Sequence, residues 1–368
     1  MSTAVDRVID DAIANQKIVG AEIVVARDGK IAYRRAAGQF DREVGIAMPE
    51  NAIYRLASVT KPIIATTALA MIDKGLLGLN DSVADHLPYF RPKLADGSPA
   101  PITIRHLLTH TAGLDYGYPV DPSITTGMTD TNLSLEENFS RVAQQPLLFA
   151  PGSGWSYSVA IDVLGAVLAE VHGGSVGDAV KAHVTGPLGM SETGFFVADK
   201  ARLAPVYADG TPAPTRMVDG QVVTNEDGGE TRFSPSRIFN DKAFQSGGAG
   251  MASTASDLLK LFQALLNGGD GLLKPETLAE AIRNQIGDLP RDDAGLRFGY
   301  LGAVVADPVA AGTPQAVGSY EWGGIYGHSW LVDPTHKLIM LSMTNTAVEG
   351  CTGRFPRDVR DAIYADLL

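Results

Sequence analysis

Segments that predict β-strands stand at both ends of this chain, with helical segments between them, and this placement constrains the fold most. Near the start, residues 21–27 and 31–37 flank Asp28-Gly29-Lys30, which predicts a β-hairpin with a glycine-containing turn. Near the end, residues 327–333 and 338–344 flank a short proline-containing turn and predict a second hairpin. Strands from both ends can share one antiparallel sheet only if the helical middle is an insertion.

The middle of the chain shows the spacing of apolar residues that is typical of helices. The predicted helices cover residues 104–109, 135–143, 160–171, 176–183 and 256–266. Amphipathic segments at residues 1–11 and 357–368 predict a helix at each terminus. A further strand is predicted at residues 298–305, and the Gly- and Pro-rich residues 207–229 predict an extended loop.

These elements predict an α+β fold, in which an antiparallel β-sheet is flanked by N- and C-terminal helices and a large helical domain is inserted. At 368 residues the chain exceeds one ordinary single-core domain. We therefore expect one domain from residues 1–55 and 240–368, which holds the sheet, and a mainly helical domain from residues 56–239. The active site is expected between the two domains.

Composition excludes several classes of function. The formal net charge of −12 argues against binding to nucleic acid or to an anionic membrane surface. No apolar run is long enough to span a bilayer, and the first residues lack the pattern of a signal peptide, so we expect a cytoplasmic protein. A single cysteine, Cys351, excludes an internal disulfide and a multi-thiolate metal site. We expect no metal and no cofactor, and the oligomeric state is not predicted.

The chemistry centres on Ser58-Val59-Thr60-Lys61, which places a hydroxyl three residues before an amine at the start of a predicted helix. The apolar residues 63–72 form this helix, and Pro62 is tolerated because it falls in the first turn. Positions i and i+3 share one helix face, so the amine of Lys61 can reach the hydroxyl of Ser58 and take its proton. This pattern predicts a serine hydrolase. An N-cap serine followed by a surface lysine is the alternative interpretation.

Six motifs in order indicate a known superfamily. They are the Ser58–Lys61 segment and residues 107–114, 151–158, 186–190, 247–251 and 322–329. In these motifs the chain resembles the serine β-lactamase and penicillin-binding-protein superfamily and, within it, the family VIII carboxylesterases. Those esterases look like class C β-lactamases but cleave ordinary esters. The similarity covers nearly the whole chain.

The resemblance implies a role for each catalytic residue. Ser58 would attack the ester carbonyl and form an acyl-enzyme, and Lys61 would act as the base. Tyr157 would pass the proton to the leaving alcohol and activate the deacylating water. The backbone N–H groups of Ser58 and Ile325 would bind the oxyanion. Which of Lys61 and Tyr157 holds the proton stays open, and Tyr157 as an ordinary core aromatic is the alternative.

The chain departs from the β-lactamases at two positions. Where their third motif begins with a cation that helps to hold a substrate carboxylate, this chain has Trp322. Where their tyrosine motif ends in an amide, this chain has Val159. Both changes remove polar contacts that suit a charged β-lactam, so we expect a neutral ester to be the better substrate.

Other residues are predicted to line the substrate pocket. The candidates are Trp322, Gly323, Gly324, Trp155, Tyr116, Tyr118 and His328. His110 is predicted to pack or hydrogen-bond behind the site. The remaining histidines have no spacing that predicts a metal site.

A second serine also falls in a hydrolase pattern. Ser175 lies in Gly173-Gly174-Ser175-Val176-Gly177, which fits the nucleophile elbow of α/β-hydrolases. That motif requires a turn from a strand into a helix, but a helical run precedes this one. A glycine C-cap followed by a serine N-cap, with Asp178 three residues later, is the simpler interpretation.

Three functions compete. A serine hydrolase that acts on short-chain or small neutral esters is the leading prediction. A β-lactamase, D-amino-acid peptidase or acyltransferase is the alternative within catalysis, since the acyl-enzyme is common to all of them. A non-catalytic binding or sensor protein on the same fold is the alternative from another class. The presence of Ser58, Lys61 and Tyr157 together argues against a binder.

Overall fold

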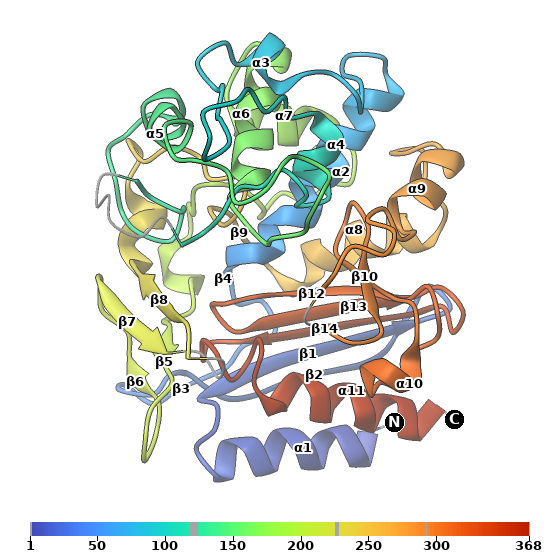
Figure 1. Cartoon of the computed structure of the whole chain (residues 1–368). Coiled ribbons are helices and arrows are strands. Elements are labelled where there is room, and N and C mark those ends of the chain that lie inside the picture. The colour runs from blue at the N-terminus through green and yellow to red at the C-terminus, as the bar shows by residue number, and fades with distance from the viewer. Residues whose placement is uncertain (1, 118–123, 225–227, 292, 368) are drawn as a thin grey trace.

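An antiparallel sheet built from both ends of the chain forms the base of the molecule (Figure 1). The computed structural model describes residues 2–117, 124–224, 228–291 and 293–367. The order of the strands in the sheet is β10-β11-β12-β13-β14-β1-β2-β3. Their bounds are β1 Gly20–Arg27, β2 Lys30–Asp41, β3 Ile46–Ala47, β10 Leu296–Phe298, β11 Ala303–Val305, β12 Tyr320–Gly324, β13 His328–Asp333 and β14 Leu338–Thr344.

The two chain ends meet in the centre of this sheet. Strand β1 pairs antiparallel with β14, and Ala21 lies opposite Thr344. At the first predicted hairpin, Asp28 and Gly29 both have positive φ, of 51° and 75°, as a tight hairpin turn between β1 and β2 requires. The α+β fold with an antiparallel sheet is therefore confirmed.

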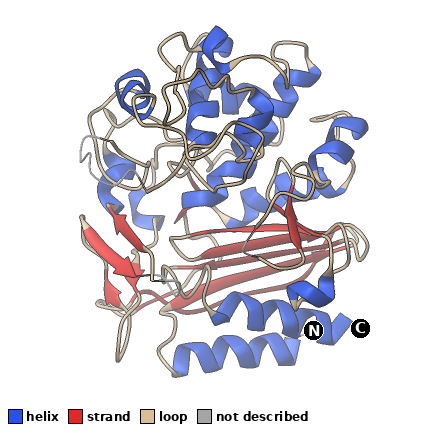
Figure 2. Cartoon of the chain, in the orientation of Figure 1, coloured by secondary structure: helices blue, strands red, loops and turns tan. Residues whose placement is uncertain are grey.

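The sheet is covered on both faces. Helix α1 (Ser2–Ala14) and helix α11 (Arg354–Leu367) lie side by side on one face (Figures 1 and 2). Because side chains alternate along a strand, Ile23 and Val25 of β1 pack in the cluster beneath these helices, whereas Val24 packs in the larger cluster on the other face. Val59 and Ile63, which flank Lys61 in the chain, belong to that larger cluster on the second face.

The helical part of the chain packs above the second face. It contains α2 Thr60–Asp73, α3 Val83–His86, α4 Ile104–Leu108, α5 Leu135–Val142, α6 Ala160–His172 and α7 Val176–Val180. Helices α8 (Ala255–Leu266) and α9 (Pro275–Ala281) follow later in the chain, and α10 spans Pro308–Ala311. Every residue of α2 from Thr60 to Met71 is buried, so this helix is a central element of the core. The helices predicted near these positions are confirmed within a few residues.

Two predictions about the later part of the chain are wrong. Residues 207–224 and 230–233 do not form one extended loop, because β5 (Tyr207–Ala208) pairs with β6 (Thr215–Arg216), and β7 (Gln221–Thr224) pairs with β8 (Glu230–Phe233). These strands pack on the rest of the molecule through Val223 and Phe233.

The segment predicted as a single strand at residues 298–305 is two strands. They are joined by a turn in which the N–H of Gly299 donates to the carbonyl of Gly302. Residues 303–305 therefore turn back along residues 296–298 as β11 beside β10.

The short strands β4 (Tyr54–Arg55) and β9 (Ala252–Ser253) pair with each other and lead into the site. The domain boundaries predicted at residues 55/56 and 239/240 stay a prediction. Within the described ranges no single helix is long and apolar enough to cross a membrane, and one bent pair, Ala160–His172 with Val176–Thr185, passes that test by length and composition only.

Candidate active site

The nucleophile segment is a strained turn between a strand and a core helix. After β4, residues Ala57–Val59 form one turn of 3₁₀ helix, and α2 follows directly. Ala57 has a φ of 44° although it is not glycine and is fully buried. A non-glycine residue in this region costs free energy that the surrounding packing must supply, and such residues cluster at functional sites. The turn places Ser58 at the N-terminal end of α2, as predicted.

Lys61 is held against Ser58. Its Nζ lies 3.0 Å from Ser58 Oγ and donates to the carbonyl of Gly248 at 2.8 Å. The residue is only 5% exposed, and in the described part of the chain no carboxylate forms an ion pair with it. Its amine also lies 4.7 Å from the centre of the Tyr157 ring and 5.4 Å from that of Tyr116. A buried amine beside a hydroxyl can exchange a proton with it.

Tyr157 stands beside this pair, on the loop before α6. Its phenolic oxygen accepts a hydrogen bond of 3.0 Å from the indole Nε1 of Trp322. Among the described residues its hydroxyl makes no hydrogen bond to Ser58 or Lys61, so the contact with Lys61 is between the amine and the aromatic ring. Because the indole is a donor only, the proton of the Tyr157 hydroxyl is free to be donated elsewhere.

Trp322 has a polar contact that sequence reasoning did not predict. It lies on β12, opposite Trp330 of β13. Its ring packs on Tyr157, with the ring centres 5.0 Å apart, and edge-on to Phe298. Trp322 therefore supplies an apolar wall and also a hydrogen-bond donor to Tyr157.

The end of β12 lies directly against the nucleophile turn. A Cβ at Gly324 would lie 2.1 Å from the carbonyl oxygen of Leu56, so only glycine permits this approach. Ile325 follows and packs in the same apolar cluster as Ala57. This places the residue whose N–H is predicted to bind the oxyanion beside the turn that carries Ser58.

Three residues predicted to line the pocket lie at different distances from the Ser58–Lys61 pair. The Tyr116 ring lies 5.3 Å from that of Tyr157, beside the Lys61 amine. Trp155 contacts Phe298, His110 and the Arg291 guanidinium, so it lies behind the side of the cleft that Trp322 forms. A Cβ at Gly323 would meet the sulfur of Cys351, on the opposite side of β12. Tyr118 lies outside the described residues.

The prediction that His328 faces the cleft is wrong. The residue is 1% exposed, its ring packs edge-on to Tyr54, and its Nε2 lies 2.8 Å from the carbonyl oxygen of Arg55. Burial lowers the pKa of His328 to about 4, so the ring is neutral at ordinary pH. Its contact is with the chain that leads to Ser58. His328 lies opposite Gly324, on the face of the sheet that residues 55–56 cover, so its side chain is buried under that segment.

Two buried residues near the site carry contacts that sequence reasoning did not identify. His110 has a φ of 57°, packs against the Tyr157 ring at 4.8 Å, and accepts a hydrogen bond from the N–H of Ser158 at its Nδ1. Its location behind the site was predicted, whereas its contact with Tyr157 was not.

Asp162, in the first turn of α6, accepts hydrogen bonds at Oδ1 from the hydroxyl of Ser246 and from the N–H of Gly248. In the sequence, Asp162 could have been noticed because it is the single acidic residue in the otherwise apolar first turns of a predicted helix.

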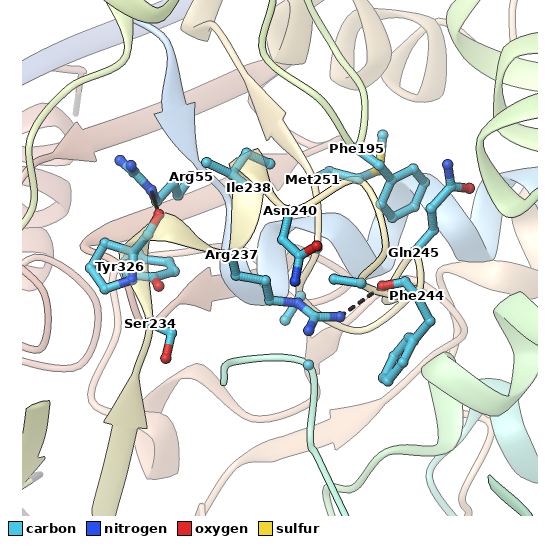
Figure 3. Close-up of a pocket in the computed structure, with 15 residues that line it drawn as sticks. Arg55, Phe195, Ser234, Arg237, Ile238, Asn240, Phe244, Gln245, Met251 and Tyr326 are labelled. Atoms are coloured by element: carbon cyan, nitrogen blue, oxygen red, sulfur yellow. Dashed lines mark hydrogen bonds between the residues drawn. The ribbon is translucent and has the colours of Figure 1, made fainter. Parts of the chain in front are cut away.

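A small cavity lies beside residues 249–251, which follow Gly248 in the chain (Figure 3). Its volume is about 40 Å³, and Ala249, Gly250 and Met251 form part of its wall. Figure 3 shows Arg237 in the middle of this cavity, with its guanidinium bonded to the carbonyl of Phe244. None of Ser58, Lys61 and Tyr157 lines it. The cavity is therefore separate from these three side chains.

Two other side chains that could be nucleophiles, Ser175 and Cys351, have structural explanations. Ser175 is the N-cap of α7, and its hydroxyl accepts from the N–H of Asp178 and donates to the carboxylate of Asp178 at 2.6 Å. The N-cap interpretation is therefore confirmed. Desolvation raises the pKa of the half-buried Cys351 thiol to about 12, which keeps it protonated at ordinary pH. The described residues contain no cluster of histidine, cysteine or acidic groups suited to a metal ion.

The chain is similar to known proteins over nearly its whole length. Residues 5–362 match the model of the Beta-lactamase family. The chain is 47% identical to Esterase EstB of Burkholderia gladioli, over 99% of this chain and 95% of the relative. Its structure superposes on that of EstCE1, described as a hydrolase with promiscuous acyltransferase activity, with a TM-score of 0.94, 42% identity and coverage of 99% and 98%. It is also 30% identical to Acyltransferase calJ of Penicillium decumbens, over 83% of this chain and 78% of the relative.

Proposed function

Since this chain belongs to the beta-lactamase family and is an ester hydrolase within it, we propose that it cleaves small neutral carboxylic esters through an acyl-enzyme on Ser58. The observation that carries the proposal is the 3.0 Å separation between Lys61 Nζ and Ser58 Oγ at the start of a buried helix. A base within hydrogen-bond reach of a hydroxyl is what nucleophilic catalysis by serine requires.

In the first step the neutral amine of Lys61 takes the proton of Ser58 while Oγ attacks the carbonyl carbon of the ester. The negative charge that develops on the carbonyl oxygen is stabilised by the N–H groups of Ser58 and Ile325. The close approach of Gly324 to Leu56 supports these two donors, because it sets the end of β12 beside the turn that carries Ser58. The new ammonium of Lys61 stays bonded to the carbonyl of Gly248.

Tyr157 supplies the proton that the leaving alcohol needs. Its oxygen accepts the N–H of Trp322, so its own proton is available for donation. The Lys61 ammonium lies 4.7 Å from the centre of the Tyr157 ring and replaces that proton through a bridging water or after a shift of its side chain toward the phenolic oxygen. In the second step a water attacks the acyl carbonyl and the same groups act in reverse, which releases the acid and restores Ser58.

The walls of the cleft favour a neutral substrate. Trp322, Tyr157 and Tyr116 present aromatic rings around the Ser58–Lys61 pair. Trp322 stands where a cation would pair with a β-lactam carboxylate, and Val159 is fully buried as the N-cap of α6. Aromatic surface without a second cation binds an uncharged acyl or alcohol group better than a carboxylate.

Acyl transfer to an alcohol is a second activity that we propose for the same site. The structure of EstCE1 is described as that of a hydrolase with promiscuous acyltransferase activity. An alcohol that occupies the place of the leaving group can attack the acyl-enzyme instead of water, so the two outcomes share one intermediate.

The proposal is tested with the rates of Ser58→Ala and Ser175→Ala on p-nitrophenyl acetate. Ser58→Ala should lose activity by several orders of magnitude, because only oxyanion binding remains. Ser175→Ala is the matched control, since it changes a half-buried N-cap serine within a hydrolase-like pattern and should leave the rate almost unchanged. Undiminished turnover in Ser58→Ala would overturn the proposal.

A further inference from the structure

A buried carboxylate lies behind the catalytic lysine. Asp162 is 1% exposed and belongs to the first turn of α6, five residues after Tyr157. Its Oδ1 accepts the hydroxyl of Ser246 and the N–H of Gly248, the latter at 3.0 Å, while its Oδ2 has no hydrogen-bond partner among the described residues. A charge buried at this depth is costly unless something nearby compensates for it.

One peptide group connects this carboxylate to Lys61. The N–H of Gly248 donates to Asp162, and the carbonyl of the same residue accepts the Lys61 amine at 2.8 Å. A Cβ at Gly248 would lie 2.1 Å from Asp162 Oδ2, so a side chain there would force the two apart. The orientation of the carbonyl that holds Lys61 is therefore fixed by Asp162.

Charge links the same two residues. Burial raises the pKa of Asp162, and the positive charge of Lys61 is the largest effect that opposes this rise. In the described part of the chain, the other ionisable groups found to interact with the pair are Arg237, His110 and the phenols of Tyr116 and Tyr157. Arg237 keeps a constant charge, and burial lowers the pKa of His110 well below its usual range. Asp162 is therefore the acid in this group that can compensate for the Lys61 ammonium.

We infer that Asp162 is a positioning residue of the ester hydrolase, which holds the Gly248 carbonyl toward Lys61 and stabilises the ammonium that forms when Lys61 takes the proton of Ser58. In that step the O–H bond of Ser58 breaks, an N–H bond forms on Lys61, and Oγ bonds to the substrate carbonyl. Asp162 gains no proton. Its negative charge favours the protonated lysine without contact with the substrate. This inference rests on the role of Lys61 in the proposed function.

The test is the pH profile of kcat/KM on p-nitrophenyl acetate for Asp162→Asn. The amide keeps an acceptor for the Gly248 N–H and removes the charge. The acid limb of the profile, where activity rises with pH, should move to lower pH by about one unit or more. The reason is that a nearby opposite charge shifts a titration by ~1–3 pH units, and the variant removes that charge. The plateau should fall ~10-fold or more, because the lysine becomes a weaker base. Asp162→Glu, which restores the charge, should return the acid limb toward its original position.

Asp257→Asn is the matched control. Asp257 is 2% exposed and stands in the first turn of α8, where it accepts the N–H of Glu192 and pairs with Lys260. Its substitution should lower stability and leave the pH profile in place. If Asp162→Asn yields too little folded enzyme, Asp162→Ser gives a second uncharged variant that leaves room for a water.

The outcomes separate this inference from the proposed function. A wild-type pH profile in the uncharged Asp162 variants would overturn the inference, even if their stability falls. Full activity in Lys61→Ala would instead overturn the proposed role of Lys61 and the inference with it. Loss of activity in Lys61→Ala, together with a shifted acid limb in Asp162→Asn, supports both.

Discussion

The indole N–H of Trp322 donates a 3.0 Å hydrogen bond to the phenolic oxygen of Tyr157. The two residues are 165 positions apart in the chain, and the bond ties the strand edge to the loop before α6. It gives the tryptophan a part in placing Tyr157, which we propose as the proton donor, in addition to its proposed part as an apolar wall.

Replacing Trp322 by phenylalanine isolates this hydrogen bond. Trp322→Phe keeps an aromatic ring and removes the donor, so kcat/KM on p-nitrophenyl acetate should fall by about 10-fold, the equivalent of a hydrogen bond worth ~1.4 kcal/mol. Trp155→Phe is the control, because the buried Nε1 of Trp155 has no hydrogen-bond partner among the described residues. Equal losses in the two variants would mean that ring size, and not the N–H, is what matters.

Lys61 and Tyr157 should behave as one proton-handling unit. The Lys61 amine lies 4.7 Å from the centre of the Tyr157 ring. In the proposed mechanism each group depends on the other to return the proton. Removing either one should therefore cost nearly as much as removing both, since effects within a catalytic unit are not additive. The measurement is kcat/KM for Lys61→Ala, Tyr157→Phe and the double variant. Losses that add in free energy would contradict a shared relay.

Trp322 should also decide between esters and β-lactams. Trp322→Lys introduces a cation that can pair with a substrate carboxylate, and it removes apolar area. The ratio of turnover on a chromogenic cephalosporin to turnover on a neutral ester should rise, although Val159 still withholds a second polar contact. An unchanged ratio, or a wild type that hydrolyses the cephalosporin as fast as its best ester, would show that the missing cation is not the cause of selectivity.

Gly324 should be required for the oxyanion site. In Gly324→Ala the new methyl group would collide with the carbonyl of Leu56 and push β12 away from the nucleophile turn. Loss of one oxyanion donor costs about 10²–10³ in kcat, and we expect a loss in that range with KM much less affected. Gly194→Ala is the control, since a Cβ at Gly194 meets nothing within 4 Å. A fully active Gly324→Ala would contradict the placement of the Ile325 N–H.

Much of this fold was predictable because its signals are local. The continuous apolar runs of β1, β14 and α2 are recognised by their length and by the turn residues at their ends, and the Ser58–Lys61 spacing on a helix fixes which two side chains meet. The hairpins at residues 207–233 were missed because their strands are only two to four residues long and owe their pairing to packing on Val223 and Phe233.

Contacts that depend on tertiary packing were harder to predict from the sequence. His328 was expected in the cleft because it follows the third motif, but the orientation of β13 relative to the nucleophile turn decides where its ring lies. The links from Asp162 to Gly248 and from Trp322 to Tyr157 join residues 86 and 165 positions apart. No local pattern in the sequence encodes contacts of that range.

The most direct test of the central claim is to trap the acyl-enzyme. Wild-type enzyme mixed with p-nitrophenyl acetate and quenched in acid within the first turnovers should gain the mass of one acetyl group. Peptide mapping should then place that group on Ser58. Lys61→Ala should show no such gain at the same time point, because the nucleophile lacks its base. An acetyl group on Ser175, or rapid turnover with no covalent species on Ser58, would contradict the account.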